Sequence, residues 1–224
     1  MGHEQEDSLL TGILLHKMRK ILKYGSFLLA VAVAAGILAG CSKKAVEVES
    51  LPQYDTEVAE GEQIAVMTIR DYGTIKIRFF KEQAPKAVEN FITHAKQGYY
   101  NELNFHRVIE NFMIQGGDPN GDGTGGAEDT IKGEFSSNGV KNDISHVRGT
   151  ISMARSTDPD SASSQFFIVQ SDSTHLDGDY AAFGHVTSGM DIVDQICKDA
   201  KPTDGNGTIA KDQQPVIESI RMVD

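Results

Sequence analysis

FHRVIENFMIQGGD, from Phe105 to Asp118, is the stretch that decides the fold, together with SSQFFIV from Ser163 to Val169. The two stretches combine one arginine, Arg107, with the neutral amides Gln115 and Gln165, among several aromatic and other apolar side chains. A permanently charged guanidinium beside amides and apolar rings indicates a pocket for an uncharged group whose polar atoms need hydrogen-bond donors. Neither stretch contains an obvious nucleophile, metal-ligand cluster or phosphate-binding loop.

The chain around these stretches shows the two-residue period of β-strands. Apolar residues alternate along Ile64–Ile69 and again along Ile75–Phe79, with a turn at Asp71-Tyr72-Gly73 between them, which predicts a β-hairpin with one buried face. Six further runs are predicted to be short strands: Phe105–Ile109, Phe112–Gln115, Gly149–Ala154, Phe166–Gln170, Ala181–Val186 and Val216–Val223.

Two segments have a helical period instead. Pro85 suits a first helical turn and Gly98 suits a C-terminal cap. Between them, apolar residues recur at i, i+3, i+4 and i+7: Val88, Phe91, Ile92 and Ala95. A second helix is predicted at Met190–Cys197. Many short strands with two helices favour a closed antiparallel barrel, because closure removes exposed strand edges.

The segment from Gly116 to Gly126 (GGDPNGDGTGG) is predicted to be a loop because of its glycines. Asp118 and Asp122 superficially suggest calcium ligands, but the twelve-residue spacing with a terminal Glu is absent. The glycines also lack the strand–GxGxxG–helix setting of a dinucleotide site. We therefore expect neither a metal nor a cofactor.

Composition limits the class of protein. The 224 residues, 39% of them hydrophobic, suffice for one ordinary domain and a tail. A net charge of −11 argues against nucleic-acid binding, which needs clustered Lys and Arg. The two cysteines, Cys41 and Cys197, are too few for a disulfide framework or a zinc site.

The N-terminal region has the layout of a secretory signal peptide. After Met18 come three basic residues, then an apolar run over Ser26–Ala39, then Leu38-Ala39-Gly40-Cys41. The apolar run is shorter than the ~20 residues that span a bilayer, which disfavours an uncleaved transmembrane helix. The LAGC ending resembles the bacterial lipobox, which implies that Cys41 receives a lipid and becomes the mature N-terminus.

These features divide the chain into three parts. Residues 1–40 are expected to be the signal peptide, and because residues 1–17 are acidic where signal peptides are basic, we expect translation to start at Met18. Residues 41–61 are expected to hold the lipid and a flexible, Glu-rich linker. Residues 62–224 are the predicted folded domain. The expected location is extracytoplasmic, anchored by lipid to a bacterial membrane.

The two stretches, in this order, closely resemble the cyclophilin family of peptidyl-prolyl cis/trans isomerases, and the resemblance covers roughly Ile64 to Val223. It implies a mainly β fold, an eight-stranded antiparallel barrel closed at its ends by two helices. It also implies an enzyme that accelerates rotation about X–Pro bonds without a cofactor. Its expected partners are proline-containing, unfolded or partly folded exported proteins, and we expect it to be monomeric.

The resemblance assigns roles to individual residues. Arg107 matches the catalytic arginine, Gln115 and Gln165 match the amides that orient the arginine and the substrate, and Ala154 matches a position on the strand that contacts the substrate backbone. The apolar walls for the proline ring match Phe112, Met113, Phe167 and Leu176. By contrast, Phe105, Phe166 and Ile168 alternate away from the pocket and are expected in the core. His106 is expected to be structural, because bond rotation needs no proton abstractor.

Three rim positions depart from the family pattern. His175 stands where many cyclophilins carry a tryptophan that is important for binding cyclosporin, which puts drug affinity in doubt. Tyr180 stands where a pocket histidine often occurs and keeps an aromatic ring with a polar tip. Arg155 replaces a common asparagine and adds charge at the substrate groove.

Two other classes of function are alternatives to catalysis. A non-catalytic chaperone module could grip proline-containing segments in the same groove without turnover, but the presence of Arg107 favours catalysis. A purely structural surface lipoprotein would not need the ordered pocket motifs.

Overall fold

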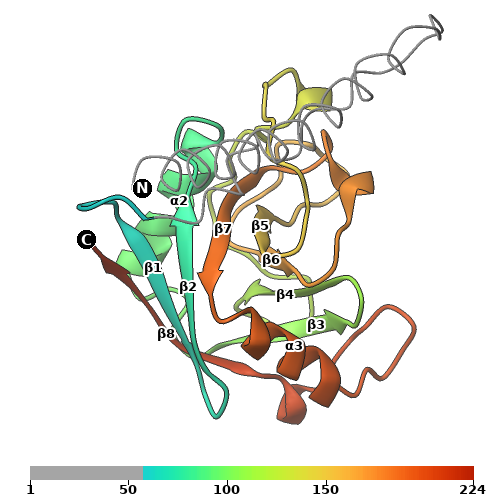
Figure 1. The fold of residues 1–224 in the computed structure, drawn as a ribbon. Helices are drawn as coiled ribbons and strands as arrows, with labels where there is room; N and C mark the ends of the chain where they lie inside the picture. The colour runs from blue at the N-terminus through green and yellow to red at the C-terminus, as the bar shows by residue number, and fades with distance from the viewer. Residues whose placement is uncertain (1–57) are drawn as a thin grey trace, which may run out of the picture. The chain divides into compact units, whose positions relative to one another are not determined.

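Residues 58–224 are described by the computed structural model, and in them eight strands form a closed antiparallel barrel (Figure 1). The strand order is β1-β2-β7-β5-β6-β4-β3-β8, and β8 pairs with β1 to close the ring. The strands are β1 (Ile64–Ile69), β2 (Gly73–Phe79), β3 (Leu103–Ile109), β4 (Met113–Asp118), β5 (Thr150–Met153), β6 (Phe166–Val169), β7 (Ala182–Ser188) and β8 (Val216–Val223). The predicted eight-stranded barrel is confirmed. Cys41, the expected signal peptide and the linker up to residue 57 lie outside the described residues.

The core fills the barrel because the inward residues of each strand are apolar. Ala65 pairs with Ile77 and Met67 with Ile75 across β1 and β2, and these four side chains are fully buried. On the other side of the barrel the predicted core residues are also fully buried: Phe105, Phe166 and Ile168. Each strand therefore has one face for the core and one face available for other contacts.

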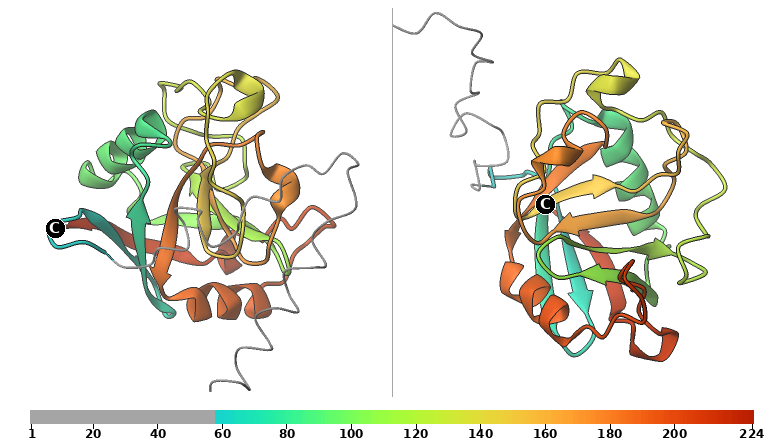
Figure 2. Two further views of the ribbon diagram at one scale, coloured as in Figure 1. Left: turned by 45° about the horizontal axis from the view of Figure 1, so that its top comes forward. Right: turned by 90° about the vertical axis from the view of Figure 1, so that its right-hand side faces the viewer.

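Two helices lie at opposite ends of the barrel, as the views in Figure 1 and Figure 2 show. Helix α2 (Pro85–Lys96) places Phe91 against Phe166, with ring centroids 5.3 Å apart in a T-shaped arrangement. Helix α3 (Met190–Asp199) buries Val193 and Ile196 at the other end. Among the described residues, no helix has the length and apolar character needed to cross a bilayer.

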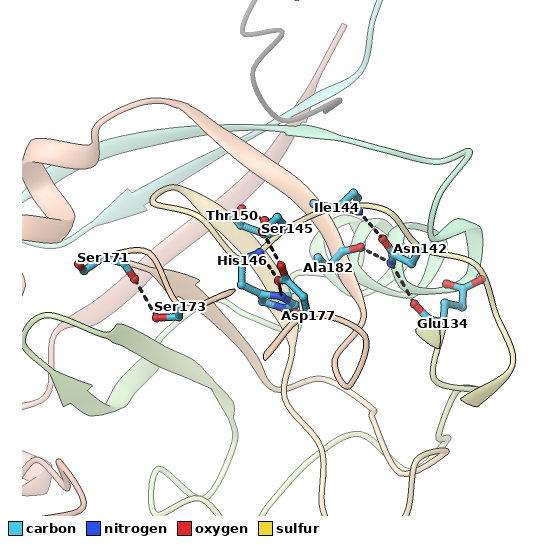
Figure 3. Close-up of polar contacts among 11 residues, drawn as sticks. Glu134, Asn142, Ile144, Ser145, His146, Thr150, Ser171, Ser173, Asp177 and Ala182 are labelled. Carbon is cyan, nitrogen blue, oxygen red and sulfur yellow. Dashed lines mark hydrogen bonds and ion pairs between the residues drawn. The ribbon is translucent and has the colours of Figure 1, made fainter. Parts of the chain in front are cut away.

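The start of α2 is capped from a distant part of the chain. The residue before the helix is Ala84, whose methyl side chain cannot accept a hydrogen bond. Instead the buried carboxylate of Glu134 accepts hydrogen bonds from the backbone N–H of Lys86 at 3.1 Å and of Ala87 at 2.9 Å. The Glu134 carbonyl in turn accepts a hydrogen bond from the amide of Asn142 (Figure 3). These contacts tie the loop around Glu134 to the first turn of the helix.

The predicted loop from Gly116 was wrong for its first three residues, because β4 continues to Asp118. The glycines serve close packing here rather than a turn. A Cβ at Gly116 would lie 2.8 Å from the Asn104 carbonyl oxygen on β3, and one at Gly117 would meet the Ser164 carbonyl oxygen. Glycine at positions 116 and 117 of β4 therefore allows the backbone at Asn104 and at Ser164 to approach this strand closely. Phe112, predicted in this strand, instead precedes it in the turn after β3.

Candidate active site

The candidate site lies on the outer face of β3, β4, β5 and β6. Arg107 on β3 pairs with Gln115 on β4, and Gln115 pairs with Phe167 on β6. Phe167 and Met113 belong to a small apolar cluster separate from the barrel core. Neighbouring positions Phe166, Ile168 and Ile114 face inward. The alternation of the strands thus divides these apolar residues between core and site.

A pocket of about 160 Å³ opens in this cluster. It brings together most of the residues that the sequence assigned to the site, from three regions of the chain, and includes two of the three rim positions, Arg155 and Tyr180. The lining consists of Arg107, Phe112, Met113, Gln115, Ala154, Arg155, Phe167, Leu176 and Tyr180. Apolar walls with a few convergent polar groups are typical of a ligand site.

Two predicted site residues lie just outside this lining. Gln165 borders a second pocket that adjoins the first. His175 is exposed on the segment after β6, and its ring lies 5.8 Å from the ring of Phe112. His175 therefore supports the outer edge of the pocket through Phe112.

Neutral groups hold Arg107 in place. Its Nε donates to the backbone carbonyl of Asn206 at 2.7 Å, and its Nη1 donates to Gln115 Oε1 at 3.1 Å. Its Nη2 donates to Asn206 Oδ1 at 3.4 Å. Burial lowers the pKa of Arg107 from its ordinary value, although arginine stays charged in proteins. No carboxylate in residues 58–224 forms an ion pair with Arg107, so its charge remains available to a ligand.

Gln115 and Gln165 form a chain of hydrogen bonds, here called the relay, from Arg107 to the glycine-rich loop. Gln115 Nε2 donates to Gln165 Oε1 at 2.9 Å. Gln165 Nε2 donates to the carbonyls of Gly123 at 3.1 Å and Gly125 at 2.7 Å. These bonds determine which end of each amide faces the arginine, so that Gln115 presents its oxygen to the guanidinium.

The Asp118 carboxylate organises the loop that ends this relay. It accepts hydrogen bonds from the backbone N–H of Asn120 at 2.8 Å, Asp122 at 3.0 Å and Gly123 at 2.6 Å. The loop that suggested calcium ligands thus uses Asp118 for its own backbone. Among the described residues, no three His, Cys, Asp or Glu side chains gather as a metal site would require.

Asn206 is a site residue that the sequence analysis missed. It lies in the loop between α3 and β8, and it contacts Arg107 from 99 positions away in the chain. Gly207 makes this approach possible. Its carbonyl accepts from Val108 N on β3 at 2.9 Å, its N–H donates to the Asp204 carbonyl at 3.3 Å, and a side chain there would collide with Ile109. The Asn-Gly pair was the available signal, since it marks a tight turn, but it does not say what the turn contacts.

His146 supports the apolar wall from beneath. Its ring is fully buried and stacks against Phe167, with centroids 5.9 Å apart and planes 17° apart. Its Nδ1 lies 2.9 Å from Asp177 Oδ1, as Figure 3 shows, and its Nε2 lies 3.0 Å from Ser152 Oγ. Burial alone would raise the pKa of Asp177, but hydrogen bonds from His146 and Ser145 lower it below its ordinary value.

Ser152, His146 and Asp177 are hydrogen-bonded to one another as in a serine hydrolase triad, but the burial of Ser152 argues against that chemistry. Ser152 is completely inaccessible to solvent, on β5 opposite Phe167. A nucleophile must reach its substrate, so this serine is placed to orient the histidine. The sequence pattern does not predict this cluster.

Two other reactive side chains are also buried away from the pocket. His106 is only 3% exposed and neither ring nitrogen has a hydrogen-bond partner, and burial lowers its pKa. Burial raises the pKa of the Cys197 thiol to about 12. A thiol with that pKa is a poor nucleophile at neutral pH. The site therefore offers two arginines, Arg107 and Arg155, together with neutral amides and apolar walls.

Comparison with known proteins agrees with this geometry. A sequence model of the family described as cyclophilin type peptidyl-prolyl cis-trans isomerase/CLD matches residues 64–222. This span includes every strand of the barrel except the last residue of β8.

Individual relatives support the same assignment. The chain is 46% identical over 146 residues to a peptidyl-prolyl cis-trans isomerase of Helicobacter pylori, an alignment that covers 64% of this chain and 87% of the relative. It is 43% identical over 133 residues to one from Acinetobacter baylyi, covering 55% and 66% respectively. A crystal structure of a Cryptosporidium parvum cyclophilin type isomerase, in the presence of the dipeptide Ala-Pro, is similar with a TM-score of 0.63 and 30% identity. It covers 72% of this chain and 99% of that one.

The closed eight-stranded barrel and these matches define the class of the protein: the chain belongs to the cyclophilin family. It is a peptidyl-prolyl cis-trans isomerase. The predicted family and enzyme class are thereby confirmed.

Proposed function

We propose that this isomerase acts on X–Pro bonds of exported proteins while they fold, as a monomer held to a membrane surface by a lipid on Cys41. The observation that carries its chemistry is Arg107, oriented by neutral groups at the edge of an apolar pocket. The sequence before Cys41, with its basic start, apolar run and LAGC ending, supports the location.

The reaction needs binding rather than bond making. Rotation about an X–Pro bond crosses a barrier of ~18–20 kcal/mol because amide resonance is lost in the twisted state. Uncatalysed isomerisation takes tens of seconds, so a turnover near ~10³ s⁻¹ needs an acceleration of about 10⁴ to 10⁵. That corresponds to roughly 5.5–7 kcal/mol by which the enzyme must bind the twisted amide better than the planar one.

Arg107 is suited to supply part of this difference. A guanidinium has five N–H groups, and three of them donate to Asn206 and Gln115 oxygens. Two remain without an oxygen partner, one on each terminal nitrogen, and Nη1 also lies 3.9 Å from the Met113 sulfur. In the twisted state the proline nitrogen becomes pyramidal and gains a lone pair that can accept such a hydrogen bond. Since the arginine is already oriented, this stabilisation requires little reorganisation.

The apolar walls provide the complementary part. Phe112, Met113 and Phe167 line the pocket beside Arg107 and can hold the proline ring while the preceding part of the peptide rotates. Ala154 and Gln165 border the groove that continues beyond the pocket and offer contacts to an extended backbone. A fixed ring and a rotating amide are what the reaction requires.

The chemistry is tested with the full chain, solubilised in detergent, in an isomerisation assay on a proline peptide. Replacing Arg107 with Ala is expected to lower kcat/KM by about 10²-fold or more, as loss of a preoriented donor does in other enzymes. A wild-type rate equal to the uncatalysed rate would contradict catalysis and favour a proline-binding chaperone module.

The anchor is tested separately in a bacterium that expresses the chain. Mass spectrometry of the mature protein should find a lipid-modified N-terminal Cys41, and Cys41→Ser should abolish the modification and the membrane association. A mature peptide that begins upstream of Cys41 without lipid would overturn this part of the proposal. Detection of Met1 in the precursor, with cleavage blocked, would instead disprove the expected start at Met18.

A further inference from the structure

A second pocket of about 380 Å³ adjoins the proline pocket, and the two share the residues Gln115, Ala154 and Arg155. The second pocket is lined mainly by glycine, serine and amide groups of the loops around Gly125 and Ser161. Neither lining contains a carboxylate side chain, and the charged residues in the two linings are both arginines, Arg107 and Arg155. The groove is thus cationic in a chain whose net charge is −11.

Backbone carbonyls hold Arg155 in one orientation. Its Nε and Nη2 donate to the Asp179 carbonyl at 3.0 and 2.9 Å, and its Nη1 donates to the Ser156 carbonyl at 2.8 Å. Its guanidinium carbon lies 4.8 Å from the ring centroid of Tyr180 and 5.1 Å from that of Phe135. Because the side chain is already ordered, a ligand that binds it would lose little additional side-chain entropy.

The charge of Arg155 is not paired. Its oxygen partners are neutral carbonyls, and no carboxylate in residues 58–224 forms an ion pair with it. The acidic residues that follow it are otherwise engaged. Asp158 Oδ1 accepts from the backbone N–H of Asp160, and the Asp160 carboxylate accepts from Gly133 N and from the side-chain amide of Asn138. At least one N–H of Arg155 Nη2 has no acceptor in the described residues.

We propose that Arg155 is a specificity-determining residue that selects substrates with an acidic side chain one or two residues from the proline. This proposal rests on the isomerase activity of the adjoining pocket. An extended peptide advances about 3.3 Å per residue, so a side chain one or two positions from the bound proline reaches a pocket that shares a wall with the first. A carboxylate there finds a fixed cation and polar walls, in pockets whose linings contain no carboxylate side chain.

The test uses peptides that contain one proline, with Glu, Gln or Lys placed in turn at each of the two positions before and after it. The full chain in detergent is assayed at low salt, and kcat/KM is compared within each set of three. At one position Glu should exceed Gln by about threefold to tenfold, the range expected for a charge-assisted contact at a partly exposed site, and Lys should be the poorest.

Two substitutions identify the residue responsible. In Arg155→Gln the Glu/Gln ratio should fall to about one, whereas in Arg155→Lys, which keeps the charge without the planar fork, it should be intermediate. Arg221→Gln is the matched control, because Arg221 is exposed on β8 and lines neither pocket. Its ratio should equal that of the wild type.

The outcomes separate this proposal from the activity on which it rests. A wild type that turns over the Gln peptides but shows no preference for Glu at any of the four positions would overturn the role of Arg155. An unchanged ratio in Arg155→Gln would do the same. A wild type inactive on the Gln peptides would contradict the isomerase function instead. If Arg155→Gln fails to fold, the wild-type ratio is measured with added salt, which should bring it toward one, and a salt-independent ratio would overturn the proposal.

Discussion

Arg107 lies at a partly buried pocket and donates only to neutral groups. Neutral partners orient the guanidinium but leave its positive charge uncompensated. A carboxylate in place of Gln115 or Asn206 would hold the guanidinium as firmly but would neutralise it. Coulomb interactions strengthen as solvent is removed, so an unpaired cation at the pocket edge interacts strongly with an amide whose electron distribution changes during rotation. Gln115 and Asn206 thus orient the arginine without neutralising it, and in the proposed function its charge is left for the substrate.

Gln115→Glu tests this argument with almost no change of shape. The new carboxylate would pair with Arg107 and would face the oxygen of Gln165, which now accepts from Gln115 Nε2. We expect kcat/KM in the isomerisation assay to fall about tenfold or more, because the cation is neutralised and the relay loses a donor. Gln213→Glu, at an exposed position outside both pockets, is the control and should retain wild-type activity. Full activity in Gln115→Glu would show that the unpaired charge is dispensable.

At the scale of the element, α2 shows how local and distant signals combine. The spacing of Val88, Phe91 and Ala95 predicts the helix and its buried face, and Pro85 begins it as expected. Its N-terminus, however, depends on Glu134, whose carboxylate accepts two of the N–H groups that the first turn leaves unpaired. A loop between β4 and β5 therefore completes a helix nearly fifty residues upstream.

Glu134→Gln should destabilise the domain by about 1–3 kcal/mol, because one of the two α2 N–H groups that now donate to the carboxylate would face an amide N–H instead of an oxygen. The measurement is the free energy of unfolding in urea. Glu110→Gln, at an exposed turn position, is the matched control and should differ from wild type by less than about 0.5 kcal/mol. Equal stability of Glu134→Gln and wild type would mean that the carboxylate contributes nothing beyond an amide.

At the scale of the whole molecule, three histidines make the stability of the domain depend on pH. Burial lowers the pKa of His94, His106 and His185 below the ordinary value of 6.5. The unfolded chain therefore binds protons at a higher pH than the native one. The stabilisation is fully present above about pH 6.5 and is lost as the pH falls toward the native pKa values.

We expect the free energy of unfolding to be nearly constant above about pH 6.5 and to decrease below it. His106→Phe should weaken this decrease, since His106 is the most buried of the three and both of its ring nitrogens lack partners. Urea unfolding at a series of pH values between about 5 and 8 measures the effect, with the exposed His175→Phe as control. Parallel pH profiles for His106→Phe and wild type would assign the pH dependence to other groups.

The sequence by itself determined the elements and the family of this protein. Strand and helix periods are local properties, so β8 was placed at its observed bounds and α2 was found from its apolar spacing. The ordered motifs around Arg107 and Phe167 carried the assignment of the pocket. The glycine-rich start of the predicted loop was misjudged because composition cannot tell a flexible glycine from one that admits a neighbouring strand.

Only the tertiary structure decided which distant residues support the site. Asn206 orients Arg107, Glu134 caps α2, and Asp177 holds His146 beneath Phe167, each across about thirty or more positions of the chain. Such contacts depend on the register with which the barrel closes, and no local period or propensity specifies that register. The same holds for Arg155, whose charge was visible in the sequence but whose neutral partners and place between two pockets followed from the packing of the loops.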